Sequence, residues 1–331
     1  MNATLHYIGH GGDQWTKIQG TVDNYPLIQS IHADPQTNRL FAGARNRNGT
    51  AYALLYLDST DTWQILQADT AMLTGVVCRK EKQEQEQEQE QGEEQGEEQE
   101  QGEEQEQEQE SVNVFYLCTN GNGIFRFSEN DIAGNPFGIA PLSQLINIGD
   151  TEKNSISFMG MIKLENDMII AVERNGGSLY EVKKDEFSQM YYNNGNPVTT
   201  GRYAMGSLAL WEDFEHSNTK ILVAGIQGGL YSTSTSSYTN GYVEFDLNSD
   251  GSFNTASERR NSNNLYTVDG NTDRYTKSLG KHPINHLLQT PKKIHPRMIF
   301  FASTQTAGLW SYRDRPDNGG PQWNAEENAE E

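Results

Sequence analysis

The sequence predicts an all-β protein built as a single β-propeller. An apolar strand–turn–strand unit recurs along the chain, and its copies start 45–55 residues apart once a Glu/Gln-rich run is set aside. One gap, between the fourth and fifth copies, is longer. Repeats of roughly 40–50 residues, each a small antiparallel sheet, are typical of propellers. The 331 residues suffice for one large all-β domain, so we predict one domain over residues 1–331.

Five copies of the repeat are recognisable, each with two apolar strands, a polar bend and then an aromatic residue. The copies start at Leu27, Leu73, Phe158, Met205 and Ile284. Their second strands align on Gly43, Cys118, Val172, Gly225 and Ser303. The aromatic residues that follow are Tyr52, Phe125, Tyr180, Tyr231 and Trp310. Turn-forming residues such as Asp34 and Pro35 lie between the two strands, which predicts hairpins rather than helices.

Five copies predict five blades. The segments Asp13–Ile18 and Pro321–Glu326 both resemble Asp61–Leu66, which we interpret as an outer, fourth strand. We therefore expect the ring to close by mixing N- and C-terminal strands in one blade. A six-bladed ring, in which Leu5–Ile18 forms half of a degenerate blade, is the alternative.

Some segments resemble the repeats of known propellers. "YLCTNGNGIFRF" and "FFASTQTAGLWSY" resemble the strand–Gly–Leu–aromatic repeats of two-component-sensor-type propellers. "GGDQW" and "DSTDTW" resemble the Asp-box turns of sialidase-like propellers, although they lack the full Ser-x-Asp-x-Gly-x-x-Trp spacing. The resemblance covers most of the chain as an architecture, is not specific to one family, and implies no catalytic residues.

A Glu/Gln-rich run occupies residues 81–110, between the first two strands of the second copy. Its fifteen Glu and one Lys contribute −14 to the net charge of −21, which leaves −7 on the rest of the chain. Because the run has no apolar surface to bury, we predict a disordered loop insertion. It expands a hairpin turn and marks no domain boundary. Residues 232–281 are also polar, and we predict a long loop region there.

Composition excludes several kinds of partner. No basic stripe is present, so we expect no nucleic acid. No apolar run reaches the length of a membrane helix, so we expect no membrane. Two cysteines fit a reducing compartment, and the N-terminus shows no signal peptide. We therefore predict a cytoplasmic monomer, with secretion by a leaderless or trimmed route as the alternative.

The two cysteines are predicted to be buried free thiols. If Ala33 faces Leu40 in the first copy, Cys78 faces a residue near Phe115 in the second. Cys118 then lies about 10 Å further along its strand, beyond the reach of a disulfide.

The bends after the second strands carry the candidate binding site. Two positions after each aligned residue lie Arg45, Asn120, Arg174, Gln227 and Gln305. One interpretation is that bends are polar in any protein. The other is a ring of hydrogen-bond donors at one mouth of the propeller channel. Two arginines in the ring favour a carboxylate or phosphate, because a guanidinium donates in a bidentate fork.

Further residues are expected near the same mouth. Glu173 lies next to an aligned position, and four residues that precede the first strands would add stacking surfaces: Tyr25, Phe158, Tyr203 and His282. Aromatic faces and amides suit sugar rings. The main hypothesis is a non-catalytic module that binds a polar or anionic small ligand, with carbohydrate as one candidate class. A protein–protein interaction scaffold is the first alternative.

The second alternative is an enzyme acting on a carbohydrate or another small substrate. A glycosidase needs two carboxylates about 5–10 Å apart. The candidates are Asp34, Glu173, Glu212 and Asp213, and the repeat places them on different rims.

No metal or cofactor is predicted. Asp246, Asn248, Asp250 and Gly251 match the start of a calcium loop, but the twelfth position is Ser257 instead of Glu. We favour a plain turn between outer strands. The seven histidines are scattered along the chain, and we expect no zinc site among them. Two of them, His32 and His286, lie on first strands of different copies, and we interpret them as structural residues.

Overall fold

The protein was examined as a computed structural model. It describes residues 6–8, 15–17, 24–34, 37, 39–57, 62–82, 111–128, 146–148, 155–174, 177–191, 195, 197, 208–212, 220–226, 241–259, 284–289, 300–304, 308–315 and 320–325. Each regular element in these ranges is a β-strand. The described segments include no helix that is long and apolar enough to cross a membrane.

Within these residues the strands form five four-stranded antiparallel sheets and one two-stranded sheet. The first sheet contains β3 (Leu27–Ala33), β4 (Leu40–Arg45), β5 (Tyr52–Leu57) and β6 (Trp63–Thr70). The second contains β7 (Met72–Lys82), β8 (Ser111–Asn120), β9 (Ile124–Ser128) and β10 (Ile146–Ile148). The third contains β11 (Phe158–Lys163), β12 (Ile169–Glu173), β13 (Leu179–Val182) and β14 (Phe187–Gln189).

The fourth sheet contains β15 (Leu208–Glu212), β16 (Lys220–Ile226), β17 (Gly241–Leu247) and β18 (Phe253–Arg259). The fifth contains β19 (Ile284–Gln289), β20 (Phe300–Thr304), β21 (Leu309–Arg315) and β22 (Gly320–Ala325). The two-stranded sheet is the hairpin of β1 (His6–Ile8) and β2 (Trp15–Lys17). In each four-stranded sheet the spatial order follows the chain, so every sheet is a simple meander.

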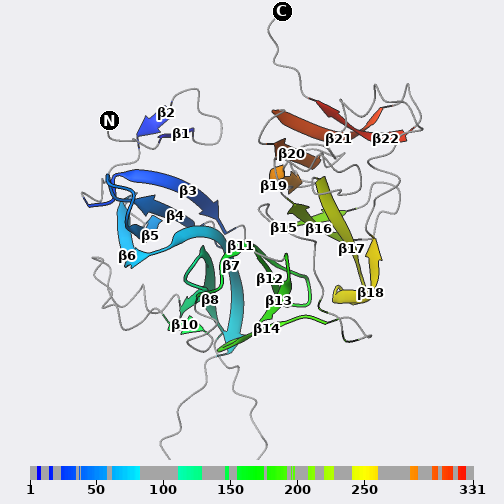
Figure 1. Cartoon of the computed structure of the whole chain (residues 1–331), viewed down its shortest axis with the longest axis horizontal. Coiled ribbons are helices and arrows are strands. Elements are labelled where there is room, and N and C mark those ends of the chain that lie inside the picture. Colours follow the sequence, from blue (N-terminus) through cyan, green and yellow to red (C-terminus); the bar gives the residue numbers. More distant parts are fainter. Residues whose placement is uncertain are drawn as a thin grey trace, which may run out of the picture.

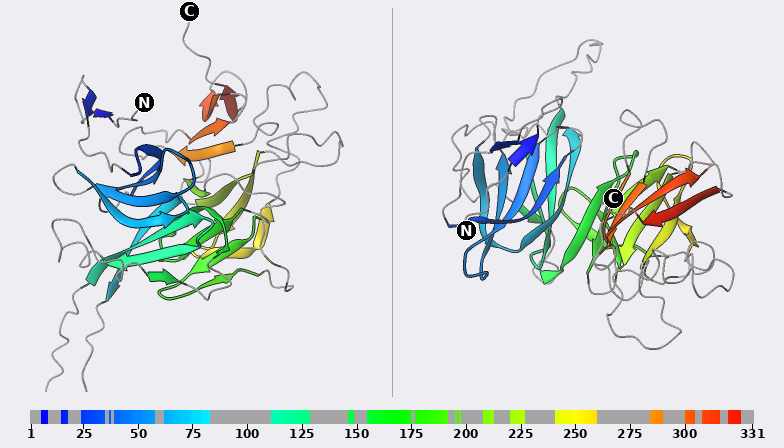
Figure 2. Two further views of the ribbon diagram at one scale, coloured as in Figure 1. Left: turned by 60° about the vertical axis from the view of Figure 1, so that its left-hand side comes forward. Right: turned by 90° about the horizontal axis from the view of Figure 1, so that it is seen from above.

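The first strands of successive sheets lie next to one another. β7 packs against β3 and β11, β11 against β15, and β15 against β19. Figures 1 and 2 show the sheets following one another around the molecule, with these strands innermost. The protein is therefore all-β with a propeller-like arrangement, as the sequence predicts.

Described core clusters lie between the first and second, the second and third, and the third and fourth sheets. Between the first and second sheets, the ring of Phe115 lies 5.2 Å from that of Phe41 and 5.2 Å from that of Phe127, centroid to centroid. Tyr116 and Phe158 belong to the cluster between the second and third sheets. Burial of aromatic surface at each boundary fixes how one sheet sits on the next.

A β-bulge recurs near the start of the first strand in four of the described sheets. It lies at Gln29, Thr74, Met159 and Asn285. The residue after each bulge pairs with the aligned position of the second strand: Ser30 with Gly43, Gly75 with Cys118, Gly160 with Val172, and His286 with Ser303. The predicted repeat alignment is therefore confirmed for these four copies. In the fourth copy, Gly225 lies on β16.

Hydroxyl groups near the bulges join neighbouring sheets. Ser30 Oγ donates to the carbonyl oxygen of Leu73 at 2.7 Å, and Thr74 Oγ1 donates to that of Phe158 at 2.7 Å. The backbones approach closely here. A Cβ atom on Gly75 would lie 3.0 Å from the backbone nitrogen of Met161, so glycine allows this contact.

The predicted pairing within the first two sheets is confirmed. Ala33 pairs with Leu40, and Cys78 pairs with Phe115. Both cysteines are buried and neither forms a disulfide, as expected. Burial raises the pKa of the Cys118 thiol to about 12.

The Glu/Gln-rich insertion and the bend of the second sheet lie at opposite ends of one ladder. Met72 pairs with Asn120 at one end, and Lys82 pairs with Ser111 at the other. Glu81 and Lys82 belong to β7, so the prediction of disorder is wrong for these two residues, which strand pairing orders. Residues 83–110 lie outside the described residues, so the prediction is not tested there.

Part of the predicted 232–281 loop is sheet. β17 and β18 supply two strands of the fourth sheet, so the loop prediction is wrong for these segments. Apolar residues alternate in β17, at Val243, Phe245 and Leu247. This period-2 pattern is short and lies within a polar segment, so it is a weak strand signal. The predicted aromatic residue Tyr231 lies outside the described residues, and Gly225 pairs instead with Tyr242.

The predicted closure is not confirmed. Asp61–Leu66 overlaps β6 and Pro321–Glu326 overlaps β22, and each of these is a fourth strand as expected. All strands of the fifth sheet come from the C-terminal part, however, and β1 and β2 pair with each other. Among the described strands, no sheet combines the two chain ends.

Candidate functional site

Two residues of the predicted ring are in contact. Arg174 Nη1 donates to Asn120 Oδ1 at 3.3 Å. Asn120 ends β8 in the second sheet, and Arg174 follows β12 in the third. Pseudo-equivalent bends of neighbouring sheets therefore meet at one end of the molecule, which we call the bend end.

Asn120 is held by a tight bend. Thr119, which is fully buried, donates both its backbone N–H and its hydroxyl to the carbonyl oxygen of Gly123, at 2.9 and 3.0 Å. Gly121 and Gly123 have φ angles of 129° and 69°, which L-residues with a Cβ rarely adopt. The sequence "TNGNG" thus forms a compact turn that presents the amide of Asn120.

Ser157 ties the two bends together. The backbone N–H of Arg174 donates to the carbonyl oxygen of Ser157 at 2.8 Å. Ser157 also forms an isolated antiparallel bridge with Asn120. The backbone of Arg174 is thereby positioned next to Asn120 independently of their side-chain contact.

Arg45 lies at the bend of the first sheet, but its side chain turns back on its own turn. Its Nη1 and Cδ atoms lie 3.5 and 3.8 Å from the place where a Cβ on Gly49 would be. Its Nε atom is buried and has no hydrogen-bond partner among the described residues. Gln227, Gln305, Tyr203 and His282 lie outside the described residues, so their predicted roles are not tested.

Glu173 interacts with Tyr180 at the same end. Burial raises the pKa of Tyr180 to about 12, and so do the negative charge of Glu173 and the hydrogen bond between the Tyr180 and Glu173 side chains. Asp34 lies at the other end of the first sheet, where it accepts hydrogen bonds from the backbone and hydroxyl of Thr37 at 2.8 and 2.7 Å. Asp34 is a turn residue, as expected, and it does not converge with Glu173. Asp213 and the side chain of Glu212 lie outside the described residues.

Two of the predicted stacking surfaces are not available. Phe158 is fully buried between the second and third sheets. Tyr25 is also buried, and its hydroxyl donates to Asp69 Oδ1 at 2.8 Å. The expectation that these rings face a ligand is therefore wrong, because Phe158 packs between two sheets and Tyr25 packs on the first sheet.

The calcium-like segment forms a plain turn between the outer strands β17 and β18. Asp250 Oδ1 accepts from the backbone and the hydroxyl of Ser252, at 2.9 and 2.6 Å, and these bonds lower the pKa of Asp250. Asn248 donates to Ser252 Oγ at 2.8 Å. The side chain of Asp246 is not described. Within the described part of the chain, no cluster of three or more His, Cys, Asp or Glu residues is suited to a metal ion.

His32 and His286 are coupled across the first strands β3 and β19. Burial and the nearby charge of His286 lower the pKa of His32 to about 4. His32 Nε2 is buried and has no hydrogen-bond partner in the described residues. Partial desolvation of the His286 ring lowers its pKa as well. Both imidazoles are therefore neutral near pH 7, which agrees with a structural role.

No protein-family model matches the sequence, and no curated protein is similar to it in sequence. Among solved structures, the periplasmic gluconolactonase PpgL of Pseudomonas aeruginosa is similar at 11% identity and a TM-score of 0.46, with 97% of this chain and 77% of that chain covered. Hydrazine synthase of Kuenenia stuttgartiensis is similar at 7% identity and 0.47, with 94% and 70% covered.

PorZ, a surface component of the type-IX secretion system of Porphyromonas gingivalis, is similar at 10% identity and a TM-score of 0.45, with 92% of this chain and 36% of that chain covered. At these identities and TM-scores, the three similarities do not indicate an activity or a ligand for this protein. No specific family is confirmed, and the resemblance to sensor-type and sialidase-like repeats stays a prediction.

Proposed function

We propose that the protein is a binding module for a small anionic or polar ligand, which docks at the bend end beside Asn120 and Arg174. The observation that carries the proposal is the contact between Arg174 Nη1 and Asn120 Oδ1. It fixes the guanidinium and the amide side by side, across the boundary between two sheets.

The contact leaves hydrogen-bond donors for a ligand. Asn120 accepts through Oδ1, so its amide N–H groups remain, and Arg174 uses one of its five N–H groups. No other side-chain bond involves these two residues among the described residues. A guanidinium beside an amide favours a carboxylate or phosphate, because both groups donate and one carries positive charge.

The finer architecture is part of the same proposal. We take the five four-stranded sheets as the five blades of one propeller, so that the bends of all copies face one mouth. The hairpin of β1 and β2 then belongs to the closure between the first and fifth sheets, where the chain ends meet.

A thermal-shift screen tests the ligand site. Sugars, sugar acids, sugar lactones, small carboxylic acids and nucleotides are added to the wild type, Arg174→Ala and Asn120→Asp. Arg39→Ala is the control, because Arg39 precedes β4 at the end of the first sheet away from the bends. A ligand that binds only the folded protein raises Tm with concentration.

We expect an anionic ligand to stabilise the wild type and Arg39→Ala but not Arg174→Ala. Asn120→Asp keeps the oxygen that accepts from Arg174 and adds a negative charge. It should therefore weaken binding of an anion about tenfold or more, and spare a neutral sugar. If no compound stabilises the wild type, or if Arg174→Ala responds like the wild type, the proposed site is wrong.

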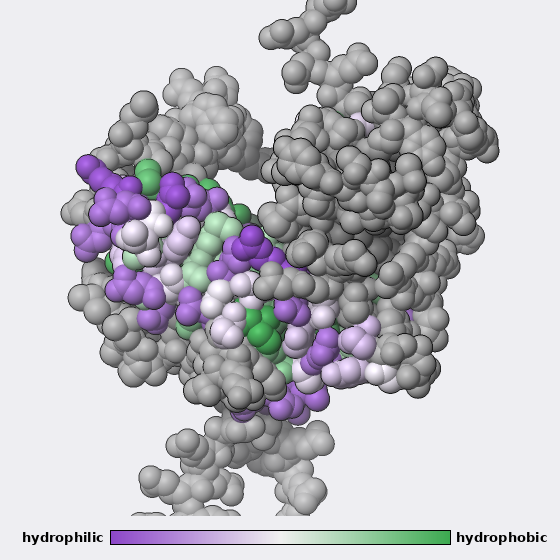
Figure 3. Space-filling view, viewed as in Figure 1, coloured by the Kyte–Doolittle hydropathy of each residue, from purple (hydrophilic) through white to green (hydrophobic). Residues whose placement is uncertain are grey.

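The two alternatives are a carbohydrate-active or other small-substrate enzyme and a protein-interaction scaffold. The two predicted carboxylates whose side chains are described, Asp34 and Glu173, lie at opposite ends of their sheets, so they do not favour a glycosidase. Exposed large hydrophobic residues in the described part are Ile31, Tyr191, Leu288 and Leu309. Figure 3 shows hydrophobic areas on the viewed face that are small and separate, unlike a protein-binding patch. Each stabilising compound is also followed by mass spectrometry, and its conversion would favour the enzyme.

A further inference from the structure

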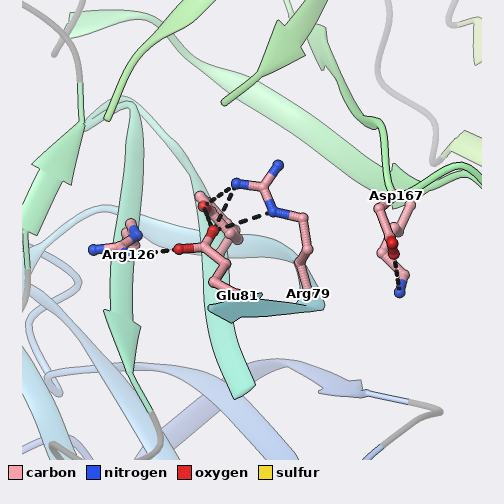
Figure 4. A network of polar contacts seen from close by, with 6 residues as sticks. Arg79, Glu81, Arg126 and Asp167 are labelled. Carbon is pink, nitrogen blue, oxygen red and sulfur yellow. Dashed lines mark hydrogen bonds and ion pairs between the residues drawn. The ribbon is translucent and has the colours of Figure 1, made fainter. Parts of the chain in front are cut away.

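A compact ionic network lies at the other end of the second sheet, next to the start of the insertion. It consists of Glu81 on β7 and three residues around its carboxylate: Arg79 on β7, Tyr116 on β8 and Arg126 on β9. Figure 4 shows the Glu81 carboxylate between the two guanidinium groups. Glu81 is the first residue of the Glu/Gln-rich run, but it belongs to β7.

Each of the three residues around Glu81 donates to its carboxylate, and Arg79 Nη2 also donates to the hydroxyl of Tyr116 at 2.6 Å. Arg79 Nη2 and Nε lie 2.6 and 3.1 Å from Glu81 Oε1, and the hydroxyl of Tyr116 donates to the same oxygen. Arg126 Nη2 lies 2.7 Å from Oε2. Both carboxylate oxygens are thus engaged, by charged donors on two strands and a phenol on a third.

The strand register explains why these residues meet. Arg79 and Glu81 are two residues apart on β7, so their side chains share one face of the sheet. Tyr116 pairs with Val77 on one side and with Arg126 on the other, which places it on the same face. Arg79 also lies over the ring of Tyr116, with Cζ 5.0 Å from the centroid.

The network is largely shielded from water. The side chains of Arg79, Glu81 and Arg126 are 16%, 11% and 14% exposed. Burial raises the pKa of Glu81, but hydrogen bonds from Tyr116, Arg126 and Arg79 outweigh it, so the pKa is lowered overall. Glu81 is therefore ionised near pH 7. Two positive groups face one negative group, so removing Glu81 would leave two arginines together without a counterion.

We propose that Arg79, Tyr116 and Arg126 form a carboxylate-binding site, and that Glu81 occupies it as an internal ligand. The bound carboxylate fixes the point at which the insertion leaves the sheet. The other fourteen Glu of the run lie beyond this point. The site stands at the end of the β7–β8 ladder opposite Asn120, so it is independent of the proposed ligand site.

The direct test is to vacate the site and offer a free carboxylate. Glu81→Ala, the wild type and the control Glu186→Ala are unfolded thermally in sodium acetate and in sodium chloride of equal ionic strength. Glu186 is a suitable control because it lies 3.9 Å from Lys183 in an exposed pair. We expect acetate to raise the Tm of Glu81→Ala in a saturable manner. It should have no such effect on the wild type, on Glu186→Ala or on Glu81→Ala/Arg126→Ala.

Two outcomes would overturn the proposal. One is an equal effect of acetate and chloride on Glu81→Ala. The other is an acetate effect that survives Arg126→Ala, because the binding would then occur elsewhere.

A second readout remains if Glu81→Ala does not fold. A glutamate-specific protease is applied to the wild type and to Arg126→Gln, and the N-terminal fragment is identified by mass spectrometry. We expect cleavage after Glu81 to be about tenfold faster or more in Arg126→Gln, because the freed carboxylate can enter the protease. Equal rates of cleavage after Glu81 would contradict the proposal.

Discussion

At the scale of single residues, polar side chains in this protein are specialised by their surroundings. Thr119 donates into its own bend, Asn120 turns its amide to Arg174, and Glu81 is enclosed by arginines. All three stand in short polar stretches of sequence. Their roles differ because strand pairing brings each one next to a different partner.

His32 makes the free energy of unfolding depend on pH. The pKa of His32 is about 4 in the folded protein and about 6.5 in an unfolded chain. Between about pH 4 and about pH 6.5, His32 is therefore protonated in the unfolded chain and neutral in the folded protein. The neutral imidazole therefore stabilises the fold fully above about pH 6.5, and this contribution is lost as the pH falls towards 4. His286 faces it and would repel its charge.

We expect His32→Gln to remove this dependence. Between about pH 7 and about pH 4.5, the free energy of unfolding of the wild type should fall by about 2 kcal/mol more than that of the variant. Urea unfolding at a series of pH values measures it. Parallel curves for the two proteins would show that His32 does not titrate in this range.

At the scale of elements, the repeated unit is a four-stranded meander that meets its neighbour through a bulged first strand. The bulge places the side chain of Thr74 at the next sheet, where its hydroxyl reaches the carbonyl oxygen of Phe158. Ser30 makes the equivalent link one sheet earlier. These bonds are part-buried and cross a boundary otherwise filled by apolar side chains, so they set the position of one sheet against another.

Thr74→Val should therefore destabilise the protein without changing its core volume. The substitution leaves the carbonyl oxygen of Phe158 without its hydroxyl donor, and we expect a loss of about 1 to 2 kcal/mol in urea unfolding. Thr74→Ser keeps the hydroxyl and serves as the control, with a smaller loss. A Val variant as stable as the Ser variant would mean that the hydrogen bond contributes nothing measurable.

The sequence was informative about the elements because their signals are local. Turn residues such as Asp34 and the apolar runs around Cys78 and Phe115 are enough to predict the strand pairing that the structure has. The bulge at Thr74 left no such signal, since it depends on two backbones at once. The Glu81 site was not predicted for a related reason. Arg126 lies 45 residues from Glu81 in the sequence, and only strand pairing brings the two together.

The meeting of two bends was predictable from the sequence, but the packing of the side chains around them was not. Counting two residues beyond Cys118 and Val172 led to Asn120 and Arg174, which do meet. Counting could not tell that Phe158 would be used by the core, or that Arg45 would lie on Gly49. Those outcomes depend on how neighbouring sheets and turns pack.

At the scale of the whole molecule, charge and structure are unevenly distributed. The insertion carries most of the net charge, whereas the sheets carry the packed core. The stability of the protein should therefore depend on the sheets, and the response to salt on the insertion.

Replacing residues 83–110 by a four-residue turn tests this division. The variant keeps Glu81 and its partners, and its net charge changes from −21 to −7. We expect the free energy of unfolding to rise by about 1 to 2 kcal/mol, because a shorter loop costs less entropy to close. Urea unfolding at low and high salt measures this effect, and the ligand response at Arg174 should be unchanged. A loss of stability would show that the insertion packs on the sheets.

The ladder between β7 and β8 has a consequence for how such a protein can change. Its ten paired rows separate Asn120 from the place where Lys82 and Ser111 meet. A change in the length of the insertion would therefore act on the chain at Lys82 and Ser111, while the opposite end of the ladder kept its shape. The same position is a suitable point of attachment: a fluorescent reporter could replace the insertion there and leave the bend end unchanged.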